Sequence, residues 1–462
     1  MGKLAVAPLT MVAYGAPGLV LAALALTFYV FLPKYYADVI GINLTVLGVV
    51  VLLSRTWDAV TDPAIGALSD RTRSRFGRRR PWMALGALPL AATFLLLVRL
   101  PRLEGVWAQG MYLGALTFLF FLFWTMVTIP YEALGAELSF RYDERTRLLG
   151  VREGAILAGT LLAAVIPMTV GVGIDTPDVA LAERERFWRV GLLYAVLVVV
   201  LVGVCVAFVR ERAWSESQRP TAMWRGVAAV WQNRPFRILL SAYAVTALGF
   251  SVAATMVLFY VEHVLGSASG PLFLALYLGI GTATVPIWVY LARRLEKKRA
   301  WLVALGINTG AFVWALLLER GDASAFAVVV VCSALGLGGV MSIPASMQAD
   351  TIDYDEWTTG RRREGQYVGF WSIVKKLAAA LSAGLAFPIL DLSGYAPGVA
   401  EQTPSALWTL KLLYVGTPSF CNVLAIVIAL RYPIDRASHE RIRSEIDARA
   451  VSSDGSSIGT DL

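Results

Sequence analysis

Histidine, cysteine and charged residues are all scarce in this sequence. It has two histidines and three cysteines among 462 residues. The cysteines lie in apolar runs, so neither a disulfide framework nor a zinc centre is predicted. We recognise no phosphate-binding glycine loop, nucleophile motif or ATP-binding domain. The protein is therefore not expected to be an enzyme or a primary pump, nor to need a cofactor.

Apolar residues dominate instead. They make up 57% of the chain, against 16% for charged residues, which is too apolar for a soluble protein of this length. An all-α integral membrane protein is predicted, with twelve spans of about 20 residues or slightly more. The first span lacks a signal-cleavage pattern and is expected to be retained. The predicted spans are 11–36, 44–69, 82–100, 106–132, 150–173, 188–209, 236–262, 270–291, 300–318, 324–349, 366–390 and 406–430.

A polar connection divides these spans into two sets of six. The predicted parts are a bundle over 1–209, a linker over 210–235, a bundle over 236–431 and a partly disordered tail over 432–462. A weak internal repeat supports the division. The basic loop DRTRSRFGRRRP and its counterpart ARRLEKKRAW each follow the second span of their half.

Basic residues indicate how the chain is oriented. The formal net charge is +8, and six arginines fall between Arg71 and Arg80. If both termini are cytoplasmic, most Lys and Arg residues lie on the cytoplasmic side, as the positive-inside rule requires. The basic character therefore indicates a lipid bilayer rather than a nucleic acid as partner. A multi-pass protein of the cell (inner) membrane is expected, without an obligate protein partner and functional as a monomer.

The second predicted span carries two carboxylates on one helix face, because Asp58 and Asp62 are four residues apart. Carboxylates at bilayer depth are unfavourable by about 2.5–3.5 kcal/mol each on insertion scales and need a compensating cation or proton. Thr61, and Thr125 of the fourth span, offer hydroxyl oxygens, and hard cations prefer oxygen ligands. The pattern predicts a site for Na⁺ or H⁺. The alternative is structural, with Asp58 paired to Arg55 and Asp62 capping the turn before a proline.

Two adjacent lysines lie in the eleventh span. Lys375 and Lys376 point about 100° apart on a helix, so they cannot share a direction. One is expected to reach the cytoplasmic surface, and the other to face the interior, where it needs a carboxylate or an anionic ligand. Surface-directed positions for both lysines remain the alternative.

Two further charged segments connect neighbouring spans: 129–154 joins the fourth to the fifth, and 348–376 joins the tenth to the eleventh. In the first, Glu132 follows Thr128 by one helical turn and is a candidate to reach a cavity, and Arg152 begins the fifth span. The remaining charges favour ion pairs that form a gate or a brace, although a solvated charged loop explains the second segment equally well. The gating candidates are Arg145 and Arg362 of these segments, together with Asp70, Arg71 and Arg78 of the basic loop after the second span.

As an ordered set, the motifs WDAVTDP, SRFGRRRPW, IPYEALGAEL–YDERTRL and DTIDYDEW–GRRREG–KK resemble the glycoside–pentoside–hexuronide:cation symporter family. This is the melibiose-permease-like branch of the major facilitator superfamily, and the resemblance covers nearly the whole chain. It implies a cation-coupled secondary symporter. Asp58 and Asp62 match the family's cation-site aspartates, Thr61 a position often held by asparagine, and Thr125 a hydroxyl ligand. Lys376 matches the lysine that links the cation and substrate sites, Arg152 a substrate-side arginine, and Arg362 a basic loop position.

The sequence departs from the family at the substrate positions. Ala22 stands where melibiose-type members carry an aspartate, and Thr128 and Glu132 where they carry an aspartate and an aromatic residue. The cation site is therefore expected to be intact and a galactoside site is not. The family resemblance favours a sugar, glycoside or uronide as the substrate. A lysolipid or another amphiphile is the alternative substrate. A non-transporting membrane receptor is a further hypothesis, which the intramembrane charges disfavour.

Overall fold

The computed structural model describes residues 7–99, 101, 105–138, 142–170, 174, 176–211, 231–360, 363–399 and 401–457. Every regular element in these ranges is helical. Eleven of the helices are long and apolar enough to cross a membrane, and a twelfth span results if one bent pair is counted as a single crossing. The prediction of an all-α membrane protein with twelve spans is confirmed.

The first half of the chain supplies six spans. The first span consists of α1 and α2, each followed by a π-helical turn, Thr27–Phe31 after α1 and Tyr36–Ile40 after α2. The helices are α1 Pro8–Leu26, α2 Leu32–Tyr35, α3 Leu44–Arg71, α4 Arg80–Val98, α5 Val106–Leu138, α6 Tyr142–Val170 and α7 Val179–Phe208.

The second half supplies the remaining spans. Two helices, α10 Gly270–Ala283 and α11 Val285–Leu295, form the bent pair, with an angle of 43° between them. A π-helical turn, Tyr260–Val264, continues the first helix of this half. The others are α9 Arg234–Phe259, α12 Lys297–Phe312, α13 Ala323–Thr359, α14 Glu364–Leu392, α15 Pro404–Lys411, α16 Thr417–Ala429 and α17 Arg436–Ser457.

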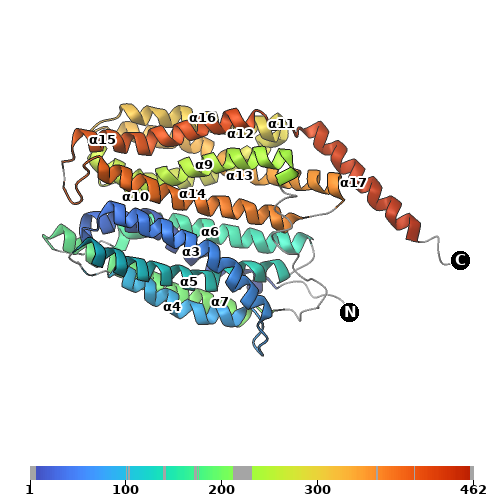
Figure 1. Cartoon of the computed structure of the whole chain (residues 1–462), viewed down its shortest axis with the longest axis horizontal. Coiled ribbons are helices and arrows are strands. Elements are labelled where there is room, and N and C mark those ends of the chain that lie inside the picture. The colour runs from blue at the N-terminus through green and yellow to red at the C-terminus, as the bar shows by residue number, and fades with distance from the viewer. Residues whose placement is uncertain are drawn as a thin grey trace.

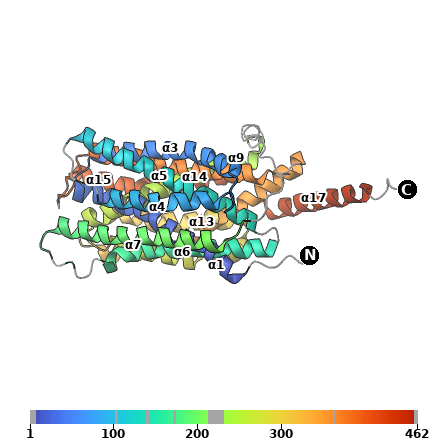
Figure 2. The ribbon, with the colours of Figure 1, turned by 90° about the horizontal axis from the view of Figure 1, so that it is seen from below.

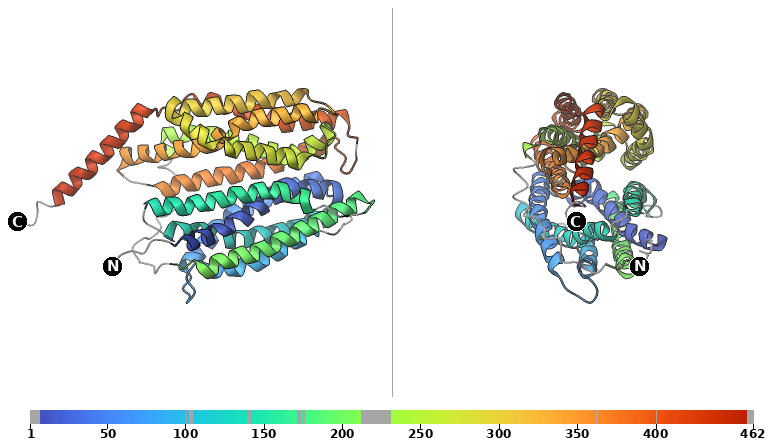
Figure 3. Two further views of the ribbon diagram at one scale, coloured as in Figure 1. Left: turned by 180° about the vertical axis from the view of Figure 1, so that it is seen from behind. Right: turned by 90° about the vertical axis from the view of Figure 1, so that its right-hand side faces the viewer.

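The two halves form two bundles that lie side by side in Figure 1. Seen from below, in Figure 2, the bundle of the first half lies in front of the second. The beginning of α1 and the whole of α17 lie at the same end of the bundles, and α17 projects beyond them (Figure 3). The arginine-rich connection between α3 and α4 is also at this end. We call this end of the bundles the basic end. The opposite end, which carries Gly41 and His263, is called the far end.

Several helices extend further than their hydropathy predicted, and α7 and α13 differ most. α7 begins at Val179 rather than near residue 188, because the i,i+3 pair Glu183–Arg186 and the i,i+4 pair Glu185–Arg189 stabilise its polar first turns. α13 continues to Thr359, ten residues beyond its predicted end. Intrahelical and interhelical polar contacts thus prolong both helices outside the apolar stretches.

Close packing of α3 against α14 joins the two halves. A Cβ atom added at Gly48 would lie 2.9 Å from the carbonyl oxygen of Ala383, and one added at Gly384 would lie 3.0 Å from Leu52 Cβ. Only residues without a side chain allow this approach. The glycines therefore bring the charged middle of α3 within reach of side chains on α14.

Candidate cation site

A cluster of charged and polar side chains lies where α3, α5 and α14 meet. Asp58 and Asp62 lie on α3, Thr125 on α5 and Lys376 on α14. Asp58 and Thr125 have no exposed surface. Because α3 and α5 belong to the first half and α14 to the second, the cluster spans the interface between the halves.

Oxygen atoms of this cluster converge on one another. The Thr125 hydroxyl oxygen lies 2.9 Å from Asp58 Oδ1 and 3.1 Å from Asp62 Oδ1. A hydroxyl has one hydrogen to donate, so it serves one carboxylate at a time and keeps lone pairs available. Two carboxylates and a hydroxyl are the ligand types that sodium and other hard cations prefer.

Two basic side chains balance the two carboxylates. Lys376 forms an ion pair with Asp62, and its Nζ lies 3.2 Å from Asp58 Oδ2. Arg55 Nη1 lies 2.8 Å from the same Asp58 oxygen. With all four groups ionised, the cluster is electrically neutral.

The two basic residues differ in how firmly they are held. The Arg55 guanidinium lies 4.4 Å from the ring centroids of both Tyr29 and Phe121, in cation–π geometry. Its side chain is 10% exposed, against 28% for Lys376. Lys376 is thus the basic residue that can leave the carboxylates with less loss of packing.

These contacts decide between several alternatives from the sequence. Asp58 does pair with Arg55, yet it also contacts Thr125 and Lys376, so the structural pairing and the cluster coexist. Lys376 faces the interior and Lys375 is exposed, which excludes a surface-directed position for both lysines. The Thr61 hydroxyl donates to the carbonyl oxygen of Asp58 at 3.3 Å.

The structure does not join the predicted substrate residues to one another by hydrogen bonds or ion pairs. Thr128 donates to the carbonyl oxygen of Trp124 in its own helix at 3.0 Å. Arg152 pairs with its neighbour Glu153 at 2.6 Å. Glu132 is exposed, and Ala22 is partly buried on α1. Glu132 is close enough to Arg152 and Lys376 for electrostatic interaction with both.

Gating candidates of the first half make contacts within that half. Asp70 at the end of α3 pairs with Arg79 at 3.0 Å. The Glu211 carboxylate accepts hydrogen bonds at 2.7–2.8 Å from the backbone N–H groups of Arg78, Arg79 and Arg80 at the beginning of α4. A carboxylate there complements the positive end of the helix dipole. Arg71 is exposed. The Arg145 side chain and all of Arg362 lie outside the described part of the structure.

The basic end of the second half is connected by ion pairs of its own. Arg363 Nη2 and Nε lie 2.6 Å and 2.9 Å from the two Asp355 carboxylate oxygens, and this hydrogen bonding raises the pKa of Arg363. Lys297 on α12 pairs with Asp350 at 2.6 Å. Trp357 Nε1 donates to Glu445 of α17 at 2.7 Å. These contacts fix α13 against α12, α14 and the C-terminal helix.

A set of polar contacts that the sequence did not predict joins the halves at the far end. Thr45 Oγ1 on α3 donates to Asp391 Oδ2 on α14 at 2.6 Å, and Asn43 Nδ2 donates to the same oxygen at 3.2 Å. Lys34 of the first half pairs with Glu262 of the second at 2.8 Å. The two bundles are therefore tied together at this end. Single polar residues at span ends gave no indication of these partners in the sequence.

Comparisons with known proteins agree with this architecture. The family model described as MFS/sugar transport protein matches residues 13–436. The chain is 28% identical over 429 residues to the glucuronide carrier protein homolog of Escherichia coli, covering 91% of each chain. It is 27% identical over 447 residues to the sodium-dependent lysophosphatidylcholine symporter 1-A of Danio rerio, covering 89% of this chain and 82% of the relative.

A solved structure shows the same fold. A bacterial homologue of the human lysosomal transporter Spinster, in an inward-facing and unoccupied conformation, superposes with a TM-score of 0.65 at 12% identity, over 92% of this chain and 95% of that one. The predicted resemblance, the major facilitator fold and the assignment as a transporter rather than an enzyme are confirmed.

Proposed function

The chain belongs to the family of MFS/sugar transport proteins, and on that premise we propose that the cluster of Asp58, Asp62, Thr125 and Lys376 is the coupling-cation site of a symporter. One observation carries the proposal: three oxygen-bearing side chains of the first half meet one ammonium group of the second half. Intramembrane ionisable residues that pair in this way mark ion pathways in transport proteins.

Charge balance indicates how a cation binds. The ionised cluster is neutral, so adding Na⁺ leaves one uncompensated positive charge in a low-dielectric site. Departure of Lys376 from the carboxylates restores neutrality, with Na⁺ taking its place beside Asp58, Asp62 and Thr125. A proton on one carboxylate has the same electrostatic effect. Na⁺ or H⁺ and the Lys376 ammonium therefore compete for the same oxygens.

This competition links cation binding to movement of the two halves. Lys376 is anchored on α14, and the carboxylates it contacts are on α3. When a cation replaces Lys376, an ion pair between the halves is lost and the ammonium becomes available to an anionic or hydroxyl-rich substrate. The described conformation, joined at the far end, is then one of the states of an alternating-access cycle.

A sugar, glycoside or uronide is the proposed substrate class. The family description and the glucuronide carrier homologue support it. Such a substrate needs polar partners, and Glu132, Arg152 and Lys376 supply both signs of charge. In this proposal, Thr128 and Ala22 complete the lining of the substrate site.

A lysolipid is the second candidate, favoured by the lysophosphatidylcholine relative. Ala22 leaves an apolar position on α1 where a sugar-binding site needs an acid. A lysolipid requires one charged contact for its headgroup, for which Lys376 is suitable, and an apolar path for its chain.

The membrane topology is part of the proposal. The basic end is placed in the cytoplasm, with both termini on that side, following the positive-inside rule. The bundles over 1–209 and 236–431 are the two moving parts, and 210–235 and the tail over 432–462 are cytoplasmic. We place the protein in the cell (inner) membrane as a functional monomer.

A thermal-unfolding screen of the purified chain tests the proposal. Uronides, glycosides and lysolipids are added in sodium chloride and in choline chloride, at two pH values. A ligand that binds only the folded state raises the free energy of unfolding by RT ln(1 + [L]/Kd), and the unfolding temperature rises as a result. If one class of compounds raises the unfolding temperature only in the presence of the coupling cation, that class is supported as the substrate. Stabilisation by a substrate that is indifferent to sodium and to pH contradicts cation coupling.

A further inference from the structure

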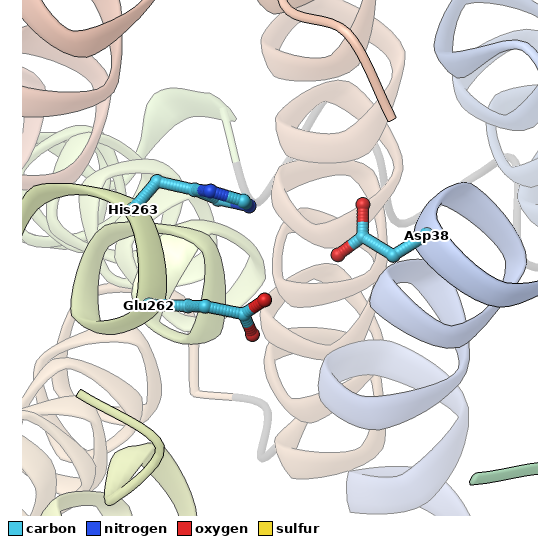
Figure 4. A group of neighbouring side chains, drawn as sticks. All are labelled: Asp38, Glu262 and His263. Carbon is cyan, nitrogen blue, oxygen red and sulfur yellow. The ribbon is translucent and has the colours of Figure 1, made fainter. Parts of the chain in front are cut away.

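A second group of possible cation ligands lies at the far end, away from the cluster described above. Asp38 lies in the π-helical turn that ends the first span, and Glu262 and His263 lie in the π-helical turn that follows α9. One ligand atom from each of the three residues lies within 4.8 Å of the others. Figure 4 shows the three side chains pointing toward one another from the two halves.

The group is held in place by neighbouring polar atoms. The Tyr395 hydroxyl donates to Asp38 Oδ1 at 2.9 Å and lies 2.8 Å from His263 Nε2. The N–H of Gly398 donates to the same Asp38 oxygen at 3.3 Å. These contacts orient the carboxylate and the imidazole, as second-shell partners do in metal sites.

A positive charge already lies between the carboxylates. Lys34 Nζ is 2.5 Å from Asp38 Oδ2 and 2.8 Å from Glu262 Oε2. The same position therefore attracts cations, and any metal must compete with this ammonium group.

Hydrated ions can reach the group from solution. All three residues line a cavity of about 650 Å³, whose other charged lining residues are Lys34, Glu183, Arg186 and Arg320. Glu183 pairs with Arg186 at 2.6 Å, which reduces the repulsion between Arg186 and an entering cation. Glu262 is the most accessible ligand, with 51% of its side chain exposed.

We propose that Asp38, Glu262 and His263 bind a divalent transition metal of the Zn²⁺ type. Two carboxylates and one imidazole form a three-residue ligand set that leaves a coordination position for water. The imidazole favours zinc-like metals over Ca²⁺ and Mg²⁺, which take oxygen ligands. Zinc ligand atoms lie about 2.0–2.2 Å from the metal, so the candidate ligand atoms, which lie within 4.8 Å of one another, move closer together when the metal binds. Lys34 moves away toward the cavity.

The metal would bridge the two halves at the far end. Asp38 belongs to the first half, and Glu262 and His263 belong to the second. If the protein works by alternating access, as proposed above, the bound metal holds this end closed and stops the cycle. That consequence rests on the proposed function, whereas metal binding itself does not.

Zn²⁺ binding to the purified full chain, measured by competition with a fluorescent zinc chelator, tests the site without any substrate. The sequence has only two histidines, which provides a matched control. His439 lies at the basic end, 3.2 Å from Asp353 and 3.5 Å from Asp350. The proposed site predicts that His263→Ala weakens zinc binding at least about tenfold, or about 1.4 kcal/mol, and that His439→Ala leaves it unchanged.

A variant with increased affinity guards against misfolding as an explanation. Lys34→Gln removes the competing ammonium and keeps all three ligands, so zinc affinity should rise by about tenfold or more. Asp38→Asn should lower it. Zinc binding that survives His263→Ala, or that is lost in His439→Ala, would overturn the assignment. Unchanged affinity in Lys34→Gln, or equal affinity for Ca²⁺, would also refute it.

Discussion

Lys376 on α14 forms an ion pair with Asp62 on α3, and so connects the second half of the protein to the first. Its Nζ also lies 3.2 Å from Asp58 Oδ2. A single ammonium group thus contacts both carboxylates of the proposed cation site. Any cation that binds these oxygens must change this contact between the halves.

Replacing Lys376 should separate cation binding from transport. In Lys376→Ala, the loss of a competing unit charge should raise sodium affinity by at least about tenfold, since such a charge at 4 Å contributes up to about 4 kcal/mol at an effective dielectric of about 20. Substrate accumulation should nevertheless be lost, because the link to α14 is gone. Sodium-dependent shifts of the unfolding temperature and vesicle uptake measure the two effects.

Lys375→Ala is the matched control, because Lys375 is exposed, and the ion pairs with Asp58 and Asp62 are made by Lys376. It should alter both quantities much less. A larger effect of Lys375→Ala than of Lys376→Ala on uptake would contradict the contacts described for α14.

The Thr125 hydroxyl should contribute directly to cation affinity. Thr125→Val keeps the side-chain shape but removes an oxygen that lies about hydrogen-bond distance from both carboxylates. Hydrogen bonds to charged groups contribute about 1.5–3 kcal/mol, so cation affinity should fall by about tenfold or more. Thr128→Val is the control, because its hydroxyl bonds within its own helix. Equal effects of both changes on cation-dependent unfolding would argue against Thr125 as a ligand.

Asp70→Ala should affect turnover more than stability. Its ion pair with Arg79 connects α3 to α4 at the basic end, and the Asp70 side chain is 42% exposed. Asp70 is partly exposed, so the loss of stability should be modest, although the Arg79 side chain is only 8% exposed and loses one partner. Monodisperse chromatography checks that the variant folds. We expect slower turnover with a smaller change in substrate affinity, and a shift in cysteine-labelling accessibility at the basic end. An unaltered labelling pattern would speak against a role in gating.

Glu132→Gln should distinguish the two substrate classes. If Glu132 takes over the sugar contact that Ala22 and Thr128 cannot make, the change should abolish sugar uptake. A lysolipid transporter should tolerate it. Unchanged sugar uptake would refute the proposed substitution. Sodium-dependent lysolipid uptake in reconstituted vesicles, without a response to any sugar, would replace sugars as the substrate class.

The spans and the centre of the site were predictable from the sequence because their patterns are local. Asp58 and Asp62 share a helix face through their spacing, and Lys376 differs from Lys375 by a fixed rotation. Hydropathy alone placed all twelve spans. It underestimated α7 and α13, where ion pairs rather than apolar residues prolong the helix.

The remaining features depend on contacts between distant segments. The aromatic surroundings of Arg55 come from Tyr29 and Phe121, on two other spans. At the far end, hydrogen bonds connect Tyr395 to Asp38 and His263 of the proposed metal site. In the sequence, all three are polar residues near span ends. Such residues are typical of any membrane boundary, so only the packing of one half on the other reveals their association.

The central claim is most directly tested by gradient-driven uptake in Asp58→Asn and Asp62→Asn. Asp62→Asn is the milder change, since Asp58→Asn also leaves the buried Arg55 without its partner, and monodisperse chromatography confirms folding of both. Purified variants in vesicles receive the compound identified by the unfolding screen, with an imposed sodium or proton gradient. We predict that neither gradient drives accumulation in either variant, while the wild-type protein accumulates the compound. Full accumulation by both variants would contradict the cation-site assignment.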